Sequence, residues 1–262
     1  MTFAKPLDNL PLWAIYVVTV ALVLLSIEAG FRLGGRRVRI AKAERESSVG
    51  SMVSASLGLL AFLLAFTFGM AASRYEARRE VFLDEVNGIG TCYLRSGMLP
   101  EPYRTRIRDL LREYVETRIQ AVQSGKLEEA IRHSVQLHDQ LWAQATEIAQ
   151  ANPSSIIVGL FVQSLNDVID LHTKRVSAGL RSRIPGIIWA GLYAITVLGM
   201  AEMGYQTGLA GRRRPLSIPA VALAFSAVIV LIADLDRPGE GFIQVDRKAL
   251  AELLEGMAPP SG

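Results

Sequence analysis

Residues able to do chemistry are few and scattered in this chain. His133 and His138 are five positions apart, which places them on different faces of a helix, so they cannot chelate a metal as an i, i+4 pair would. His172 lies on an apolar helical stripe, where it is either a packing histidine or a pH sensor. The single Cys92 excludes an intramolecular disulfide and is expected to be a buried, inert thiol. The sequence has no phosphate loop, dinucleotide fingerprint or nucleophile set. We therefore expect no catalytic residue, no metal and no cofactor, and we expect that the protein is not an enzyme.

Three carboxylates lie where charge is costly. Glu28 and Glu202 each come 16 residues after the start of a long apolar stretch and just before an arginine-rich loop, so both should lie at similar depth near one membrane face. A carboxylate inside a span is a functional candidate by default. Each is therefore either an ion-path group or, this near an interface, the partner of a headgroup or of a neighbour such as Arg32. Asp234, at the end of the last stretch, is a third candidate for an ion path or a subunit interface.

The elements that must position these groups are strongly apolar. The chain has 262 residues, 50% hydrophobic and 20% charged, with a mean hydropathy of +0.28. Its apolar residues concentrate in four stretches of 18–21 residues, at 12–31, 52–72, 186–204 and 216–233. A helix of that length rises ~27–32 Å, enough to cross a bilayer core. The pattern excludes a soluble enzyme and a disordered tail, and it predicts a polytopic membrane protein in contact with lipid. The first apolar stretch is expected to be a retained transmembrane helix, not a cleaved signal peptide.

Charge is concentrated in the short loops. The formal net charge is +3, yet segment 73–184 has 15 basic and 14 acidic residues, a balance without the footprint of a nucleic-acid partner. Segments 31–50 and 206–215 hold nine basic residues, against four on the side of the termini. The loop-charge rule places the termini and the long segment outside the cytoplasm. The arginines that flank the long segment leave the opposite orientation open.

The long middle segment reads as helix throughout. No proline interrupts residues 51–96, so the second span should continue out of the membrane as one helix that ends before Pro100. Three more amphipathic helices should follow, ending near Ser124, near Ala149 and before Pro185, and the second of these should turn four residues inward: Ile131, Val135, Leu141 and Ile148. The fold class is therefore all-α, with four transmembrane helices and an extramembrane helical bundle between spans two and three. The expected parts are a first transmembrane pair at 1–72, the bundle at 73–184, a second pair at 185–235 and a tail at 236–262 with a short amphipathic helix.

The second span carries two stripes at helical spacing. Small residues form one stripe: Gly58, Ala61, Ala65 and Gly69. Large apolar residues form the other: Leu59, Phe62, Phe66 and Met70. Small stripes let helices approach closely in lipid, whereas large apolar side chains from several subunits can form a hydrophobic constriction that gates a pore by dewetting. Both can also be plain packing surfaces. Leu64 is expected on the opposite, lipid-facing side.

Short motifs give the chain a family resemblance. Residues 62–69, leading into Arg74, Tyr75, Glu76 and Arg78, are similar to the second span of bestrophins, in which an aromatic-rich neck precedes an aromatic-Glu-Ala-Arg sequence. More closely, the chain resembles an uncharacterised bacterial family called bestrophin-like, through residues 83–91, 99–102, 166–172 and 233–238. The chain departs from bestrophins in its single aromatic before the glutamate and in its lack of their acidic calcium clasp.

The resemblance implies an ion channel that conducts inorganic ions. Bestrophins are pentamers, so it implies a homo-oligomer of five subunits, with the second span lining the pore. It also implies a multi-pass protein of the bacterial plasma (inner) membrane, with the bundle inside. Two other functions stay open. One is a non-conducting membrane scaffold or sensor whose bundle binds a partner protein, and the other is a stator-like energy-coupling subunit.

Overall fold

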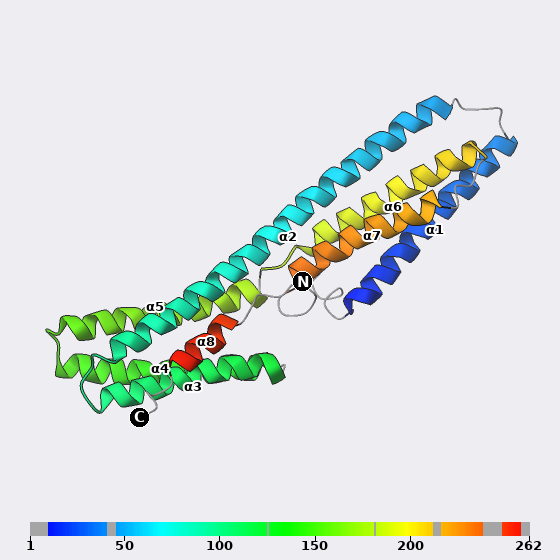
Figure 1. Ribbon diagram of the computed structural model, residues 1–262. Coiled ribbons are helices and arrows are strands. Elements are labelled where there is room, and N and C mark those ends of the chain that lie inside the picture. Colours follow the sequence, from blue (N-terminus) through cyan, green and yellow to red (C-terminus); the bar gives the residue numbers. More distant parts are fainter. Residues whose placement is uncertain are drawn as a thin grey trace. The chain divides into compact units, whose positions relative to one another are not determined.

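In the computed structural model, the described residues are 10–40, 46–124, 126–180, 182–211, 216–237 and 248–257. They form eight helices and no strand, which confirms the all-α fold (Figure 1). The helices are α1 (Leu12–Ile40), α2 (Glu46–Ser96), α3 (Tyr103–Ser124), α4 (Leu127–Ala151), α5 (Ile156–Leu180), α6 (Gly186–Leu209), α7 (Ser217–Asp236) and α8 (Lys248–Gly256). The arginines at 212–214 and the segment 238–247 lie outside the described residues.

Four of these helices, α1, α2, α6 and α7, are long and apolar enough to cross a membrane. The prediction of four spans is therefore confirmed. The second span and its extension are also one helix of 51 residues, as the absence of proline predicted. Within α2 we take the apolar stretch 52–72 as the membrane-spanning part and the charged residues beyond it as extramembrane.

The chain divides into two compact units, and α2 contributes residues to both. The first unit contains the described residues of 1–76 and 182–244, that is α1, the first part of α2, α6 and α7. The second contains those of 77–181 and 245–262, that is the rest of α2, α3, α4, α5 and α8.

The first unit is organised by a very close contact between α1 and α6. The two helices run parallel, because Ile27 lies against Gly204 and Phe31 lies against Gly208. Gly30 and Gly34 on α1 face backbone atoms of α6 in the same way, so a Cβ at any of these four glycines would collide with a carbonyl oxygen of the other helix. Glycine at i and i+4 on both helices removes the side chains that would separate the two backbones.

The C-terminal end of α7 fixes the starts of two other spans. The Asp236 carboxylate accepts a hydrogen bond from the Ile184 backbone N–H at 3.0 Å, two residues before α6 begins. The Arg237 guanidinium donates to the Leu10 carbonyl oxygen at 2.7 Å, just before α1. Because both side chains are buried, these bonds satisfy polar groups that would be costly to leave unpaired.

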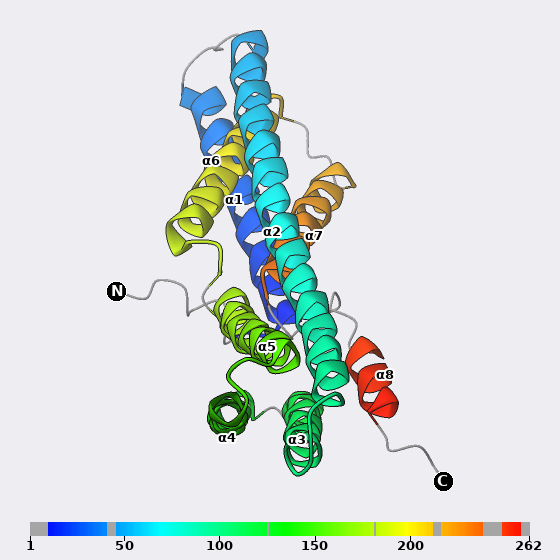
Figure 2. The same cartoon turned by 90° about the vertical axis from the view of Figure 1, so that its left-hand side faces the viewer.

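The second unit is a helical bundle around an apolar core (Figure 2). The core side chains come from the extramembrane part of α2 and from α3, α4 and α5. Leu141 and Ile148 of α4 are buried as expected, but the inward placement of Val135 is wrong, since its side chain is 46% exposed. His138, at the next position of that face, takes the interior place instead. The tail helix α8 packs on α3 with Leu250 inside.

The glycine contact predicts a strong asymmetry among glycine substitutions in α6. Gly204→Ala should lower the stability of the first unit by about 1–3 kcal/mol, because the new methyl group overlaps the Ile27 carbonyl. Gly191→Ala on the same helix has open space around it and should be neutral or slightly stabilising. Thermal unfolding in one detergent compares the two variants, and equal midpoints would contradict the contact.

Candidate functional site

The second span presents an apolar face that the other described residues leave uncovered. Leu59, Phe62 and Phe66 are 51%, 65% and 59% exposed, and the two phenylalanine rings stack with centroids 6.5 Å apart. Met70, the fourth predicted constriction residue, is half-buried. The small residues of the other stripe are not buried by the chain: Gly58, Ala61, Ala65 and Gly69. The two stripes therefore lie together on one open face of α2.

The opposite face of this span packs inside the first unit. Leu60, Leu64 and Ala71 are buried in its apolar cluster, and Thr67 is buried between them. The expectation that Leu64 faces lipid is therefore wrong. An apolar side chain looks the same to sequence reasoning whether it faces lipid or a neighbouring helix, because the lipid tails are equally apolar.

Glu28 and Glu202 lie at similar depth, because their neighbours Ile27 and Gly204 touch. The Glu28 carboxylate forms an ion pair with Arg32 at 2.8 Å, the neighbour that one of the two alternatives named. Glu202 is half-buried, and its Oε2 atom has no hydrogen-bond partner among the residues that the structure describes. The two carboxylates thus have different surroundings despite their matched positions.

The remaining predicted residues are spread over both units. Asp234 is 2% exposed inside the first unit, so in the single chain its carboxylate faces no open surface. Of the family-motif residues, Arg74 and Tyr75 are half-buried and Glu76 is exposed. Arg78 is buried and interacts with other groups.

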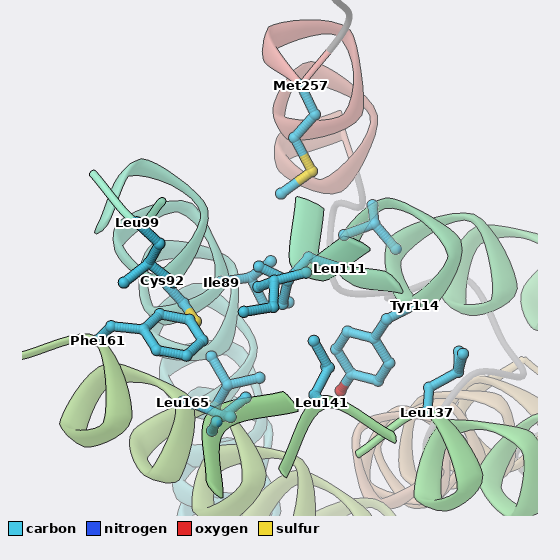
Figure 3. Packing of buried hydrophobic residues seen from close by; sticks show 14 of the residues in the cluster. Ile89, Cys92, Leu99, Leu111, Tyr114, Leu137, Leu141, Phe161, Leu165 and Met257 are labelled. Atoms are coloured by element: carbon cyan, nitrogen blue, oxygen red, sulfur yellow. The ribbon is translucent and has the colours of Figure 1, made fainter. Parts of the chain in front are cut away.

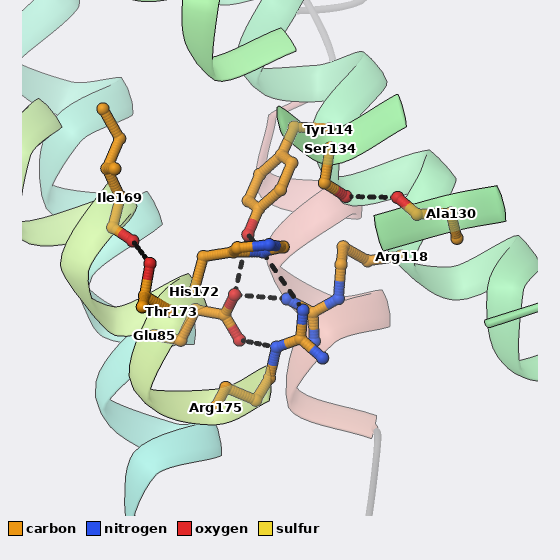
Figure 4. A network of polar contacts seen from close by, with 9 residues as sticks. All are labelled: Glu85, Tyr114, Arg118, Ala130, Ser134, Ile169, His172, Thr173 and Arg175. Carbon is orange, nitrogen blue, oxygen red and sulfur yellow. Dashed lines mark hydrogen bonds and ion pairs between the residues drawn. The ribbon is translucent and has the colours of Figure 1, made fainter. Parts of the chain in front are cut away.

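A buried polar cluster, absent from the predicted site residues, joins α2, α3 and α5 of the second unit through hydrogen bonds and ion pairs (Figure 4). Its centre is the carboxylate of Glu85 on α2, which is 1% exposed. The Tyr114 hydroxyl of α3 donates to Glu85 at 2.7 Å, and the Arg118 guanidinium bonds the same oxygen. Arg175 of α5 places its Nε 2.9 Å from the other oxygen, as an ion pair without aligned hydrogen-bond geometry. We call Glu85, Tyr114, Arg118, His138, His172 and Arg175 the polar cluster.

Two histidines complete the polar cluster. His172 Nδ1 lies 3.1 Å from the Tyr114 hydroxyl and 3.2 Å from Arg175 Nη2. His138 of α4 packs on the Tyr114 ring at 4.8 Å and meets the His172 ring edge-on at 4.9 Å between centroids. The five-residue spacing correctly separates His133 from His138, since His133 instead contacts Glu113 of α3 at 3.1 Å. In the described parts of the chain, no group of three or more potential metal ligands occurs.

The electrostatics of the polar cluster follow from burial and from its two arginines. Burial alone would raise the pKa of Glu85, but the Arg118 and Arg175 charges outweigh burial and hold this pKa below its usual value. Burial, together with the Glu85 charge, raises the pKa of Tyr114. Glu85 is therefore ionised and Tyr114 is neutral at pH 7. Nearby, burial raises the pKa of the Cys92 thiol to about 12, which agrees with the expected inert cysteine.

The polar cluster carries a clear prediction. Glu85→Ala should destabilise the second unit by about 3–5 kcal/mol, because it leaves two buried guanidiniums without their shared anion. Its neighbour Asp84 is not buried, so Asp84→Ala is the matched control and should change stability little. Hydrogen exchange of α3 and α5 amides measures the effect, and equal protection in both variants would contradict it.

The chain matches known proteins over nearly all its length. A family model described as the Bestrophin-like domain matches residues 17–250. A crystal structure of a point mutant of a bacterial bestrophin homolog from Klebsiella pneumoniae superposes with a TM-score of 0.64 at 15% identity, covering 94% of this chain and 96% of that chain. Another structure of this homolog gives 0.64 at 14% identity, covering 93% and 94%.

No curated protein matches the sequence. At such low identity the structural likeness shows a shared fold, which is that of a membrane protein with several apolar helices. The match to the Bestrophin-like domain shows the family, because this match covers most of the chain. The protein belongs to the bestrophin-like family.

Proposed function

We propose that this protein is the subunit of a homo-oligomeric ion channel whose pore is lined by α2. The observation that carries the proposal is the open apolar face of this helix, where two stacked phenylalanines are more than half exposed. Family membership supports it, because the resemblance to bestrophins implies a channel. The cargo is inorganic ions and the chemistry is transport, not catalysis.

The arrangement of the two stripes fits an assembly around an axis. The small residues sit beside the phenylalanines on one face, and a methyl group added at Gly58 or Gly69 would have no neighbour within 4 Å. Side chains of this size let a helix of another subunit approach closely. The phenylalanines beside that contact would then converge as an apolar ring.

A ring of phenylalanines gives a physical gate. Water leaves a narrow apolar constriction, and ions cannot cross it without their hydration. The proposed constriction is formed by Phe62 and Phe66, flanked by Leu59 and Met70. We place the assembly in a bacterial inner membrane, with five subunits as the bestrophin resemblance implies, and with the lipid bilayer as its other partner.

Removing the aromatic rings should open the gate. Phe62→Ala with Phe66→Ala should raise ion flux several-fold in liposomes that hold the pure protein, because the wider constriction stays wet. Leu231→Ala, at an exposed apolar position of α7, is the control and should leave flux unchanged. Absence of flux from every variant and from the parent protein, with a monomeric particle, would contradict the channel and favour the scaffold.

Enlarging the small stripe should weaken assembly. Ala65→Leu adds three carbons to the proposed contact and should cost about 1–3 kcal/mol per site, by analogy with overpacked cores. Ala224→Leu makes the same change at an exposed position of α7 and should leave the oligomer intact. Particle mass in mild detergent distinguishes them, and loss of the oligomer in the α7 variant alone would assign the interface to the wrong helix.

A further inference from the structure

The polar cluster of the second unit holds two buried imidazoles beside two guanidiniums and one carboxylate. We propose that His138 and His172 make it an acid-operated latch, whose protonation releases α5 from α2 within this unit. The inference concerns the bundle alone and does not depend on the proposed channel.

Charged and titratable groups face the two histidines from every helix of the latch. They are Glu85 from α2, Tyr114 and Arg118 from α3, His138 with its neighbour Asp139 from α4, and His172 and Arg175 from α5. Two guanidiniums therefore stand against one buried carboxylate, so the cluster already carries one excess positive charge before either imidazole takes up a proton.

Two neighbours of His172 Nδ1 compete for this atom. A guanidinium has no acceptor atom, so Arg175 Nη2 forms a hydrogen bond to Nδ1 only while Nδ1 carries no hydrogen. The single hydroxyl hydrogen of Tyr114 goes to Glu85, so the contact between Nδ1 and the Tyr114 oxygen is a hydrogen bond only when Nδ1 itself donates. In neutral His172 one of these two contacts is therefore satisfied, and Nε2 is a buried atom that has no hydrogen-bond partner among the described residues.

A second proton on His172 removes the hydrogen bond from Arg175. Nδ1 then carries a hydrogen that faces both the Tyr114 oxygen and the Arg175 guanidinium, and a third buried cation joins the cluster. A proton on His138 adds a like charge to the same space, because its ring touches both Tyr114 and His172. In the closed bundle, burial first and the arginines second lower the pKa of His172 to about 3, and burial lowers that of His138 to about 4.

The sign of the pH effect follows from these values. Once the latch opens, each histidine regains a pKa near ~6.5 in water. Between about pH 6.5 and pH 4 the open state therefore binds more protons than the closed state. The ratio of open to closed molecules rises as the pH falls, by up to about tenfold per pH unit for each histidine.

Cys92 is a built-in reporter of this opening. It is the chain's single cysteine, it is fully buried, and its thiol forms a hydrogen bond with Ser164 of α5. Phe161 and Leu165 of the same helix belong to the apolar cluster that contains it (Figure 3). Helix α5, which covers the thiol, is thus the same helix that carries His172 and Arg175. The reactivity of Cys92 measures the open fraction.

The test follows thiol reactivity of the full-length protein in detergent between pH 6.5 and pH 4.5. A dithiodipyridine reagent, which reacts with thiols in acid, gives a rate that is divided by the rate of free cysteine at the same pH. In the parent protein this ratio should rise as the pH falls and return to its starting value when neutral pH is restored. The slope should approach about two decades per pH unit when both histidines contribute.

Single substitutions show how much each histidine contributes to the slope. His172→Gln and His138→Gln should each lower the slope by up to about one decade per pH unit, while His133→Gln, at the exposed histidine of α4, should leave it unchanged. A flat ratio in the parent protein would overturn the latch. So would a slope that is equal in the parent and in both variants, since carboxylates would then drive the opening. Because the two histidines are changed separately, one variant that fails to fold still leaves the other as a test.

Discussion

The single helical phase of α2 is the constraint on which the rest of the structure depends. One unbroken backbone supplies Leu60, Leu64 and Ala71 to the core of the first unit. The same backbone supplies Phe82, Val86, Ile89 and Cys92 to the core of the second. No proline or bulge interrupts this helix, so one register of the backbone runs through both cores. The open stripe with Phe62 and the burial of Glu85 are thus two results of one periodicity.

The two units hold together by different physics. In the first, the surrounding lipid is as apolar as the helices, so cohesion relies on close backbone contact at Gly30, Gly34, Gly204 and Gly208. In the second, water drives apolar side chains inward, and the core can also enclose an ionised Glu85 because Arg118, Arg175 and Tyr114 satisfy it. A glycine contact tolerates almost no change of size, whereas the buried charges tolerate almost no change of protonation.

The sequence was sufficient to predict the parts of this fold that depend on local pattern. Span length, the helix ends before Pro100 and Pro185, and the place of His172 on the inward face of α5 are all local properties, and they agree with the structure. Partner choice is not local. Leu64 and Val135 were misplaced because periodicity shows a stripe but not the neighbour that covers it.

Two features were missed for different reasons. The glycine contact had a visible signal, since Gly30 to Gly34 and Gly204 to Gly208 both follow the Gly-x-x-x-Gly pattern, but the small stripe of α2 is longer and gives a stronger signal of the same kind. The polar cluster had none, because Glu85, Arg118 and Arg175 lie far apart in the chain and look like ordinary surface charges on amphipathic helices. The place of His172 on an apolar stripe is visible in the sequence, but its partner Tyr114 lies on another helix and therefore cannot be read from local spacing.

The hydrogen bond from Arg237 to Leu10 has a consequence for biogenesis. It joins groups 227 positions apart, so almost the entire polypeptide has to leave the ribosome before the bond can form. Until then, the carbonyl ahead of α1 and the N–H ahead of α6 must be solvated by water or lipid headgroups at the interface. Insertion of the last span therefore completes the first and third spans as well. The first span to be translated is therefore among the last to be completed. A nascent chain stalled before α7 would leave the backbone groups ahead of α1 and α6 without these partners.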